Sequence, residues 1–180
     1  IEPPNALETL QHWISALGCV IHKNYSKLYF RSSSGHLIFS RRSMMKEKVF
    51  EKVYADHPKD AFATKACEEM LGIAALRKDL ERQVELWTNL VFKTLKTKHT
   101  PGYAGQLAKH HFRASEFTKG VEVIKSCHEK EQSKFIESVH GNGAAVTGEL
   151  FRSDATKPQA EKLADEVISF LEERIPNDLS

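Results

Sequence analysis

The residues with the clearest capacity for chemistry are bases interleaved with aromatic side chains in the first third of the chain. Two short aromatic segments, residues 27–32 and 36–41, flank Ser33-Ser34-Gly35, a pattern that predicts a β-hairpin. Bases can pair with phosphates, and exposed aromatic rings can stack on unpaired nucleic-acid bases. The candidate nucleic-acid-binding residues are Lys27, Tyr29, Arg31, Arg41, Arg42, Lys46 and Lys48. One interpretation is therefore RNA or single-stranded DNA binding through a basic hairpin around residues 27–48.

Strand alternation limits this interpretation. Residues two apart on a strand share a face, so Leu28 and Phe30 are expected to enter the core and leave Tyr29 as the exposed stacking platform. Basic runs are also common on solvated faces of proteins that bind no anion. The hairpin region therefore keeps two interpretations, a nucleic-acid surface or an ordinary solvated face.

Histidine and cysteine could support metal or proton chemistry. Cys19 and His22 have a spacing that can chelate zinc, but no second close pair completes a four-ligand site. Glu137 and His140 match half of a di-iron helix motif, and the chain contains no second Glu-x-x-His. We therefore expect no metal and no cofactor.

His128 interrupts an otherwise apolar helical stripe beside Cys127, and His110 is followed directly by His111. A histidine withdrawn from water can act as a proton carrier, whereas a core histidine is more commonly hydrogen-bonded to a neighbour. Whether His110, Cys127 and His128 form a site stays open on the sequence alone.

Strong catalytic motifs do not occur in the chain. It has no phosphate-binding Gly-x-x-x-x-Gly-Lys-Ser/Thr loop, no Gly-x-Gly-x-x-Gly, no Gly-x-Ser-x-Gly and no His-Glu-x-x-His. We assign no catalytic residue and expect a non-enzymatic protein, with a histidine-assisted hydrolase or metal enzyme as a further alternative.

The elements that position these residues are mostly helices with apolar side chains recurring every three or four residues. The expected helices are residues 3–17, 44–54, 61–98, 103–113, 115–141 and 158–175, with one or two helical turns over 144–151. The third of these contains a straight helix from Ile73 to Lys98, with Gly72 as its weak point. The predicted fold is mainly α, an irregular bundle of about six or seven helices with one N-terminal β-hairpin.

Length and composition predict one helical domain over residues 1–180, which we expect to be excised from a longer protein. The 180 residues are 41% hydrophobic and 28% charged, which is ordinary for a globular domain. No apolar run is long enough to cross a membrane. Three widely spaced cysteines are the wrong number for a disulfide framework, which favours an intracellular location, cytoplasmic or nuclear.

Charge is distributed unevenly along the chain. Between residues 23 and 60, nine bases oppose four acids, a difference of +5, while from residue 149 onward four bases oppose eight acids, a difference of −4. Opposite charges of this kind allow the acidic C-terminal helix of one copy to meet the basic hairpin region of a partner. We therefore expect a protein-interaction or oligomerisation module, with nucleic-acid binding through residues 27–48 as the alternative.

Overall fold

The structure is a computed structural model that describes residues 30–31, 37–38, 41–56 and 59–174. Contacts divide the chain into two units, residues 1–46 and residues 47–180, and each is described by itself. For the described residues before 47, the backbone alone is described.

The first unit contains two very short strands, β1 (Phe30–Arg31) and β2 (Leu37–Ile38). They pair antiparallel, with Phe30 opposite Ile38 and Arg31 opposite Leu37. These strands flank the predicted turn, but the remainder of the expected hairpin and the expected helix over residues 3–17 lie outside the described residues. The N-terminal β-hairpin therefore stays a prediction.

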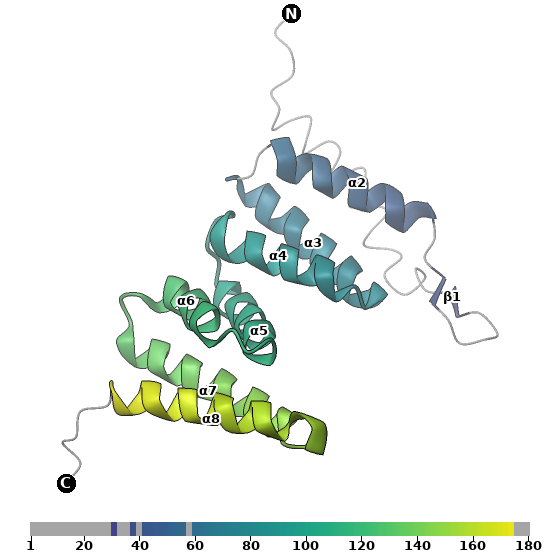
Figure 1. The fold of residues 1–180 in the computed structure, drawn as a ribbon. Coiled ribbons are helices and arrows are strands. Elements are labelled where there is room, and N and C mark those ends of the chain that lie inside the picture. The colour runs from purple at the N-terminus through teal and green to yellow at the C-terminus, as the bar shows by residue number, and fades with distance from the viewer. Residues whose placement is uncertain (1–29, 32–36, 39–40, 57–58, 175–180) are drawn as a thin grey trace, which may run out of the picture. The chain divides into compact units, whose positions relative to one another are not determined.

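Mainly helical architecture is confirmed for the described part of the chain, which contains seven α-helices and a short 3-10 helix, η2 (Asp154–Thr156). The α-helices are α2 (Arg41–Asp56), α3 (Ala61–Arg77), α4 (Leu80–Phe92), α5 (Thr100–Arg113), α6 (Phe117–His128), α7 (Gln132–Leu150) and α8 (Lys157–Glu172). From α3 onward each helix packs against the next, and α5 also packs against α7. Figure 1 shows these helices following one another in space in chain order, with α5 and α6 between the pair α3 and α4 and the pair α7 and α8.

The long straight helix predicted from Ile73 to Lys98 is wrong. α3 ends at Arg77, because Lys78 adopts the left-handed conformation (φ 57°) and its N–H bonds back to Ala74 and Ala75. Asp79 then caps α4 by accepting a hydrogen bond from the Arg82 N–H. The chain reverses within two residues, and one apolar stripe is divided between two packed helices.

The single helix predicted over residues 115–141 is also wrong. It is divided into α6 and α7, which are separated by three residues ending at Glu131. The predicted stop at Gly141-Asn142-Gly143 lies inside α7 instead. A Cβ on Gly143 would lie 2.6 Å from Val167 Cγ2, so this glycine allows α8 to approach α7 closely.

The described core forms two hydrophobic clusters that meet at α4. Leu86 and Leu90 of α4 join residues of α3, while the neighbouring Val91 joins the larger cluster that α5 to α8 build. Tyr103 packs against both clusters. Ala160, Leu163 and Val167 of α8 recur at helical spacing and are buried.

Candidate interaction surfaces

The structure separates the predicted nucleic-acid-binding residues into groups. Lys27 and Tyr29 lie outside the described residues, and Arg31 is in β1. The remaining four candidates, Arg41, Arg42, Lys46 and Lys48, lie on α2. Arg41, which was predicted to end the second strand, instead begins α2, whereas Lys46 and Lys48 lie on a helix as the sequence predicted.

One side of α2 faces the rest of the second unit. Phe50 and Tyr54 pack against the cluster of Cys67, Met70, Ala74, Leu86 and Leu90. Residues four apart share a helix face, so these two rings form an apolar anchor along α2. Glu47 and Glu51, at the same four-residue spacing, extend this inner side with carboxylates.

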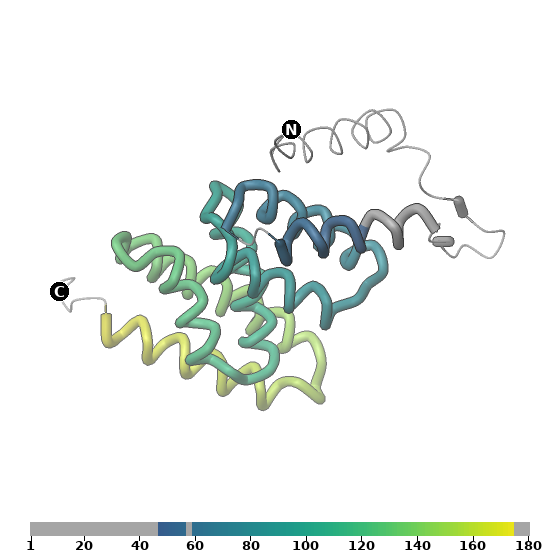
Figure 2. The backbone as a smooth tube through the Cα atoms, turned by 90° about the horizontal axis from the view of Figure 1, so that it is seen from above, coloured from purple at the N-terminus to yellow at the C-terminus, as the bar shows by residue number. Residues whose placement is uncertain are grey.

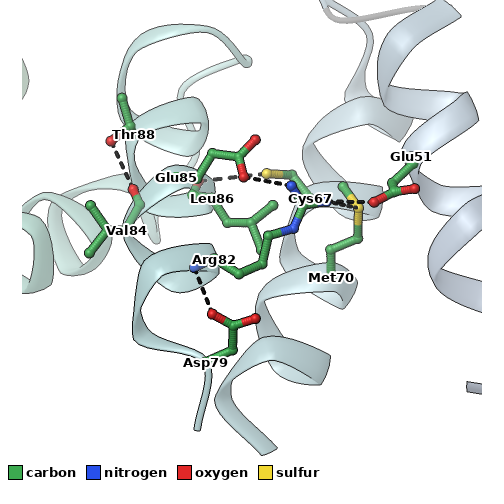
Figure 3. A network of polar contacts seen from close by, with 9 residues as sticks. All are labelled: Glu51, Cys67, Met70, Asp79, Arg82, Val84, Glu85, Leu86 and Thr88. Atoms are coloured by element: carbon green, nitrogen blue, oxygen red, sulfur yellow. Dashed lines mark hydrogen bonds and ion pairs between the residues drawn. The ribbon is translucent and has the colours of Figure 1, made fainter. Parts of the chain in front are cut away.

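Both of these carboxylates pair with arginines from other helices. Arg77 of α3 donates to Glu47 at 2.5 Å, and Arg82 of α4 donates to Glu51 at 2.8 Å. Arg82 also reaches Glu85 at 2.6 Å, so one guanidinium links two carboxylates from two helices (Figure 3). Burial lowers the pKa of Arg82, but the hydrogen bond and charge of Glu85, followed by the charges of Glu51 and Glu47, raise it overall. Glu47 and Glu51 of α2 are thus each paired with an arginine of the neighbouring helices, Glu47 largely buried and Glu51 half-exposed.

Beneath this network lies a fully buried thiol, Cys67, which packs against α4 and is joined to it by a weak hydrogen bond to the Leu86 carbonyl, with Sγ and O 3.6 Å apart. Burial is the main reason that the pKa of Cys67 rises to about 12, while the charge of Arg82 opposes the rise. A thiol that stays protonated and inaccessible is a poor nucleophile. Cys67 is therefore a packing residue.

The opposite side of α2 is basic and exposed. Lys48, Val49 and Lys52 are all exposed, and their spacing places them on one side of the helix. Val49 keeps 42% of its surface exposed, which leaves an apolar side chain between the two lysines. Lys52 and Val49 were not among the predicted site residues, although the four-residue repeat of Lys48 and Lys52 on a predicted helix was the available signal.

The last helix has an exposed acidic side. Glu161, Asp165 and Glu172 of α8 are exposed, and their spacing of four and seven residues places them along one stripe. Ile168 lies within the stripe with 51% of its surface exposed. Two helices of the second unit thus present outward stripes of opposite charge, each with an exposed aliphatic residue.

Among the described residues, His110, His111 and His128 make separate contacts. His111 at the end of α5 donates to the Glu116 carboxylate, with Nδ1 and Oε2 2.7 Å apart. Burial, followed by the charge of His111, lowers the pKa of the adjacent His110. His128 is the last residue of α6, a helix of twelve residues that is about 18 Å long.

His128 has a buried Nδ1 atom without a hydrogen-bond partner. The nearest carboxylate oxygen, from Glu131, is 3.6 Å away, which is beyond hydrogen-bond distance. Cys127 beside it is half-buried, and its Sγ contacts Ser126 Oγ at 3.8 Å. The contacts of Cys127 and His128 thus involve neighbours in the chain, and those of His110 involve His111.

Over the described ranges, no three side chains of histidine, cysteine, aspartate or glutamate are grouped so that they could hold a metal ion. Within the same residues, no helix has the length and apolar character needed to cross a membrane. Comparisons of the chain with protein-family models, with curated proteins and with solved structures found no match.

Proposed function

We propose that this chain is a non-enzymatic protein-interaction module that associates through the outward faces of its helices. One observation carries the proposal: α2 and α8 expose stripes of opposite charge, the lysine side of α2 and the acidic side of α8. Complementary charges of this kind select partners and speed their encounter. Self-association is the form that the two stripes favour.

Internal pairing strengthens this interpretation of α2. The helix carries acids as well as bases, so its total charge would say little about a partner. Because Glu47 and Glu51 are held by Arg77 and Arg82, the charge that α2 offers to a partner between residues 47 and 54 comes from Lys48 and Lys52. The exposed surfaces of Val49 and Ile168 add apolar area to bury on association.

Sedimentation velocity at two salt concentrations tests this function. We expect the protein to sediment as an oligomer or with a captured protein partner at low salt, and to dissociate at about 0.5 M salt because ionic screening weakens exposed charge pairs. A protein that stays monomeric and captures no protein partner at either salt concentration would contradict the proposal.

A second candidate function, binding of RNA or single-stranded DNA, is favoured by the number of bases along α2. Arg41, Arg42 and Lys46 precede Lys48 and Lys52 on one helix, which concentrates five bases within twelve residues. Titration with labelled single strands at low salt is the direct measurement. We expect binding to weaken with salt and with replacement of Arg41 and Arg42 by alanine, and an affinity indifferent to both changes would exclude this function.

We also place the module inside the cell, in the cytoplasm or the nucleus. Both cysteines in the described part of the chain, Cys67 and Cys127, are free thiols. Free cysteines are typical of reducing compartments, and intact mass after alkylation of protein from its native source would show whether they remain reduced there.

A further inference from the structure

We propose that the turn between α4 and α5 is a docking surface for an anionic lipid bilayer. This surface, the α4–α5 tip, comprises residues 92–99, from the last residue of α4 to the residue before α5. Bilayer binding goes beyond the proposed function and does not depend on it. Two exposed apolar side chains, three exposed lysines and an ordered backbone support it.

Two large apolar side chains are exposed at the tip. Phe92, the last residue of α4, keeps 52% of its surface exposed, and Leu95 in the turn keeps 47%. Their Cα atoms are joined by three peptide units, which span about 10 Å at most, so one partner can bury both. Exposed apolar side chains that lie together mark contact surfaces more often than isolated ones do.

The charges around these side chains have a single sign. Lys93, Lys96 and Lys98 are all exposed. The sequence contains no aspartate or glutamate between residues 86 and 115. None of the ion pairs among the described residues involves these three lysines, and Lys96 donates instead to the backbone carbonyl of Val91. Their positive charge is therefore available to an anionic partner.

Hydrogen bonds hold the backbone of the tip in place. Thr94 is buried, and its Oγ1 donates to the Leu90 carbonyl oxygen at 3.3 Å. Thr100, which is also buried, accepts from the Thr97 N–H through its Oγ1 at 2.8 Å. Because these threonines tie the turn to α4 and to α5, little conformational entropy remains to be lost when the tip meets a partner.

The shape of the tip favours a broad surface as the partner. Six of the eight residues from 92 to 99 are exposed, which is typical of a protruding turn and not of a groove that holds a peptide. A single-stranded nucleic acid would stack on Phe92 but would leave Leu95 without a role. At an anionic bilayer both apolar side chains enter the headgroup region, while the lysines attract the anionic lipids.

Co-sedimentation of the full chain with vesicles tests the proposal. The probes are vesicles of phosphatidylcholine and vesicles of phosphatidylcholine with about 30% phosphatidylserine, at about 0.1 M salt. We expect binding to the anionic vesicles to be at least about tenfold tighter, and to be lost at about 0.5 M salt because screening weakens the attraction of the lysines. Equal binding to both vesicles, or binding to neither, would overturn the proposal.

Two double variants separate the apolar and the charged contributions. Phe92→Ser/Leu95→Ser removes the apolar side chains, and Lys93→Glu/Lys98→Glu reverses two charges of the tip. We expect each variant to bind anionic vesicles at least about tenfold more weakly, because a bilayer contact uses both kinds of side chain. Circular dichroism and urea unfolding check that each variant stays folded.

The control for the apolar variant is Leu76→Ser/Leu80→Ser. These leucines are exposed to a similar degree, 41% and 53%, but lie beside Asp79 and Glu81. We expect this control to bind the anionic vesicles like the unmodified chain.

The control for the charged variant is Lys157→Glu/Lys162→Glu, which changes net charge equally on α8, the yellow helix along one edge of the second unit (Figure 2). It too should bind like the unmodified chain. Equal weakening by either control, or loss of binding only when Lys48 and Lys52 of α2 are replaced, would overturn the assignment to the tip.

Fluorescence quenching tests whether the tip enters the bilayer. Phe92→Trp keeps a large ring at the tip, and the unmodified chain, with Trp13 and Trp87, gives the background. With anionic vesicles whose acyl chains carry bromine, we expect stronger quenching of Phe92→Trp than of the unmodified chain. Equal quenching of the two proteins would show that position 92 stays outside the bilayer and would overturn the proposal.

The outcomes for bilayer binding and for the proposed function are distinguishable. A chain that binds vesicles through the tip but stays monomeric and captures no protein would refute the proposed function alone. A chain that associates with protein but ignores vesicles would overturn bilayer binding alone. Binding of labelled single strands that Lys93→Glu/Lys98→Glu abolishes, without binding to vesicles, would assign the tip to nucleic acid instead.

Discussion

Replacing Gly120 with alanine probes a close contact between α5 and α6. A Cβ at this position would lie 2.6 Å from Cδ1 of the Phe112 ring and closer still to Cε1, so the ring must shift. Phe112 is fully buried and stacked on Phe117 with ring centroids 5.5 Å apart, which leaves the ring little space to move. We therefore expect Gly120→Ala to destabilise the fold.

The expected magnitude is the difference of two opposing effects. Alanine in place of glycine inside a helix stabilises by about 1 kcal/mol. Overpacking a filled core costs about 1–3 kcal/mol, and contact with an immobile buried ring places Gly120 at the upper end of that range. The free energy of unfolding should fall by about 1–2 kcal/mol, which lowers Tm by roughly 3–8 °C for a domain of this size.

Urea unfolding followed by circular dichroism measures this change, with Gly72→Ala as the matched control. Gly72 lies in α3 with nothing within 4 Å of an added Cβ, so alanine there should stabilise by about 0.5–1 kcal/mol. Replacing Phe112 with leucine removes part of the ring, so the losses from Gly120→Ala and Phe112→Leu should not add in the double variant. A Gly120→Ala protein at least as stable as the unmodified chain would refute the packing of α5 on α6.

Three further changes test other parts of the fold. Asp60 accepts a hydrogen bond from the Phe62 N–H at 3.0 Å, so Asp60→Ala should cost about 1 kcal/mol in urea unfolding, and no loss would contradict the cap. Arg82→Met removes the pair with Glu51, so hydrogen exchange of α2 amides should accelerate while α8 amides stay unchanged, and equal rates in α2 would show that this pair does not hold the helix. Because burial raises the folded-state pKa of Cys67 from 9.0 to about 12, its stabilising contribution is complete below pH 9 and is lost as pH rises toward 12. Mass-spectrometric mapping at pH 8 should find Cys67 unalkylated until urea unfolds the chain, and rapid labelling of the folded protein would contradict its burial.

Helical periodicity predicted most helices of the described chain but failed where a break carries no glycine or proline. The chain turns at Lys78 because this lysine adopts the left-handed conformation. Lysine rarely does so, and therefore the sequence pattern did not predict a turn there. The opposite error occurred at Gly143, where a residue that commonly ends helices is required for close packing on Val167. Local pattern indicates which residues turn inward, while tertiary contact decides where each helix ends.

The sequence predicted the overall charge of the candidate surfaces but not which of their charged side chains are exposed. The sequence places bases in the first third of the chain and acids in the last third. It cannot show which acids pair with arginines of other helices. Glu47 meets Arg77 across 30 residues of chain, and Glu51 meets Arg82 across 31. Pairs so distant in sequence form only after α2, α3 and α4 have packed together.

This internal pairing explains how a helix of mixed charge acquires a basic outer side. Over residues 47–56, α2 carries three acids and two bases, a sum of −1, yet two of the acids face the arginines of α3 and α4. If α2 were rotated by half a turn, Lys48 and Lys52 would face Arg77 and Arg82, and the glutamates would face outward beside the acids of a partner's α8. Repulsion on both sides would oppose that arrangement, so the same arginines that fix α2 on the stack also determine the charge that it presents to a second copy.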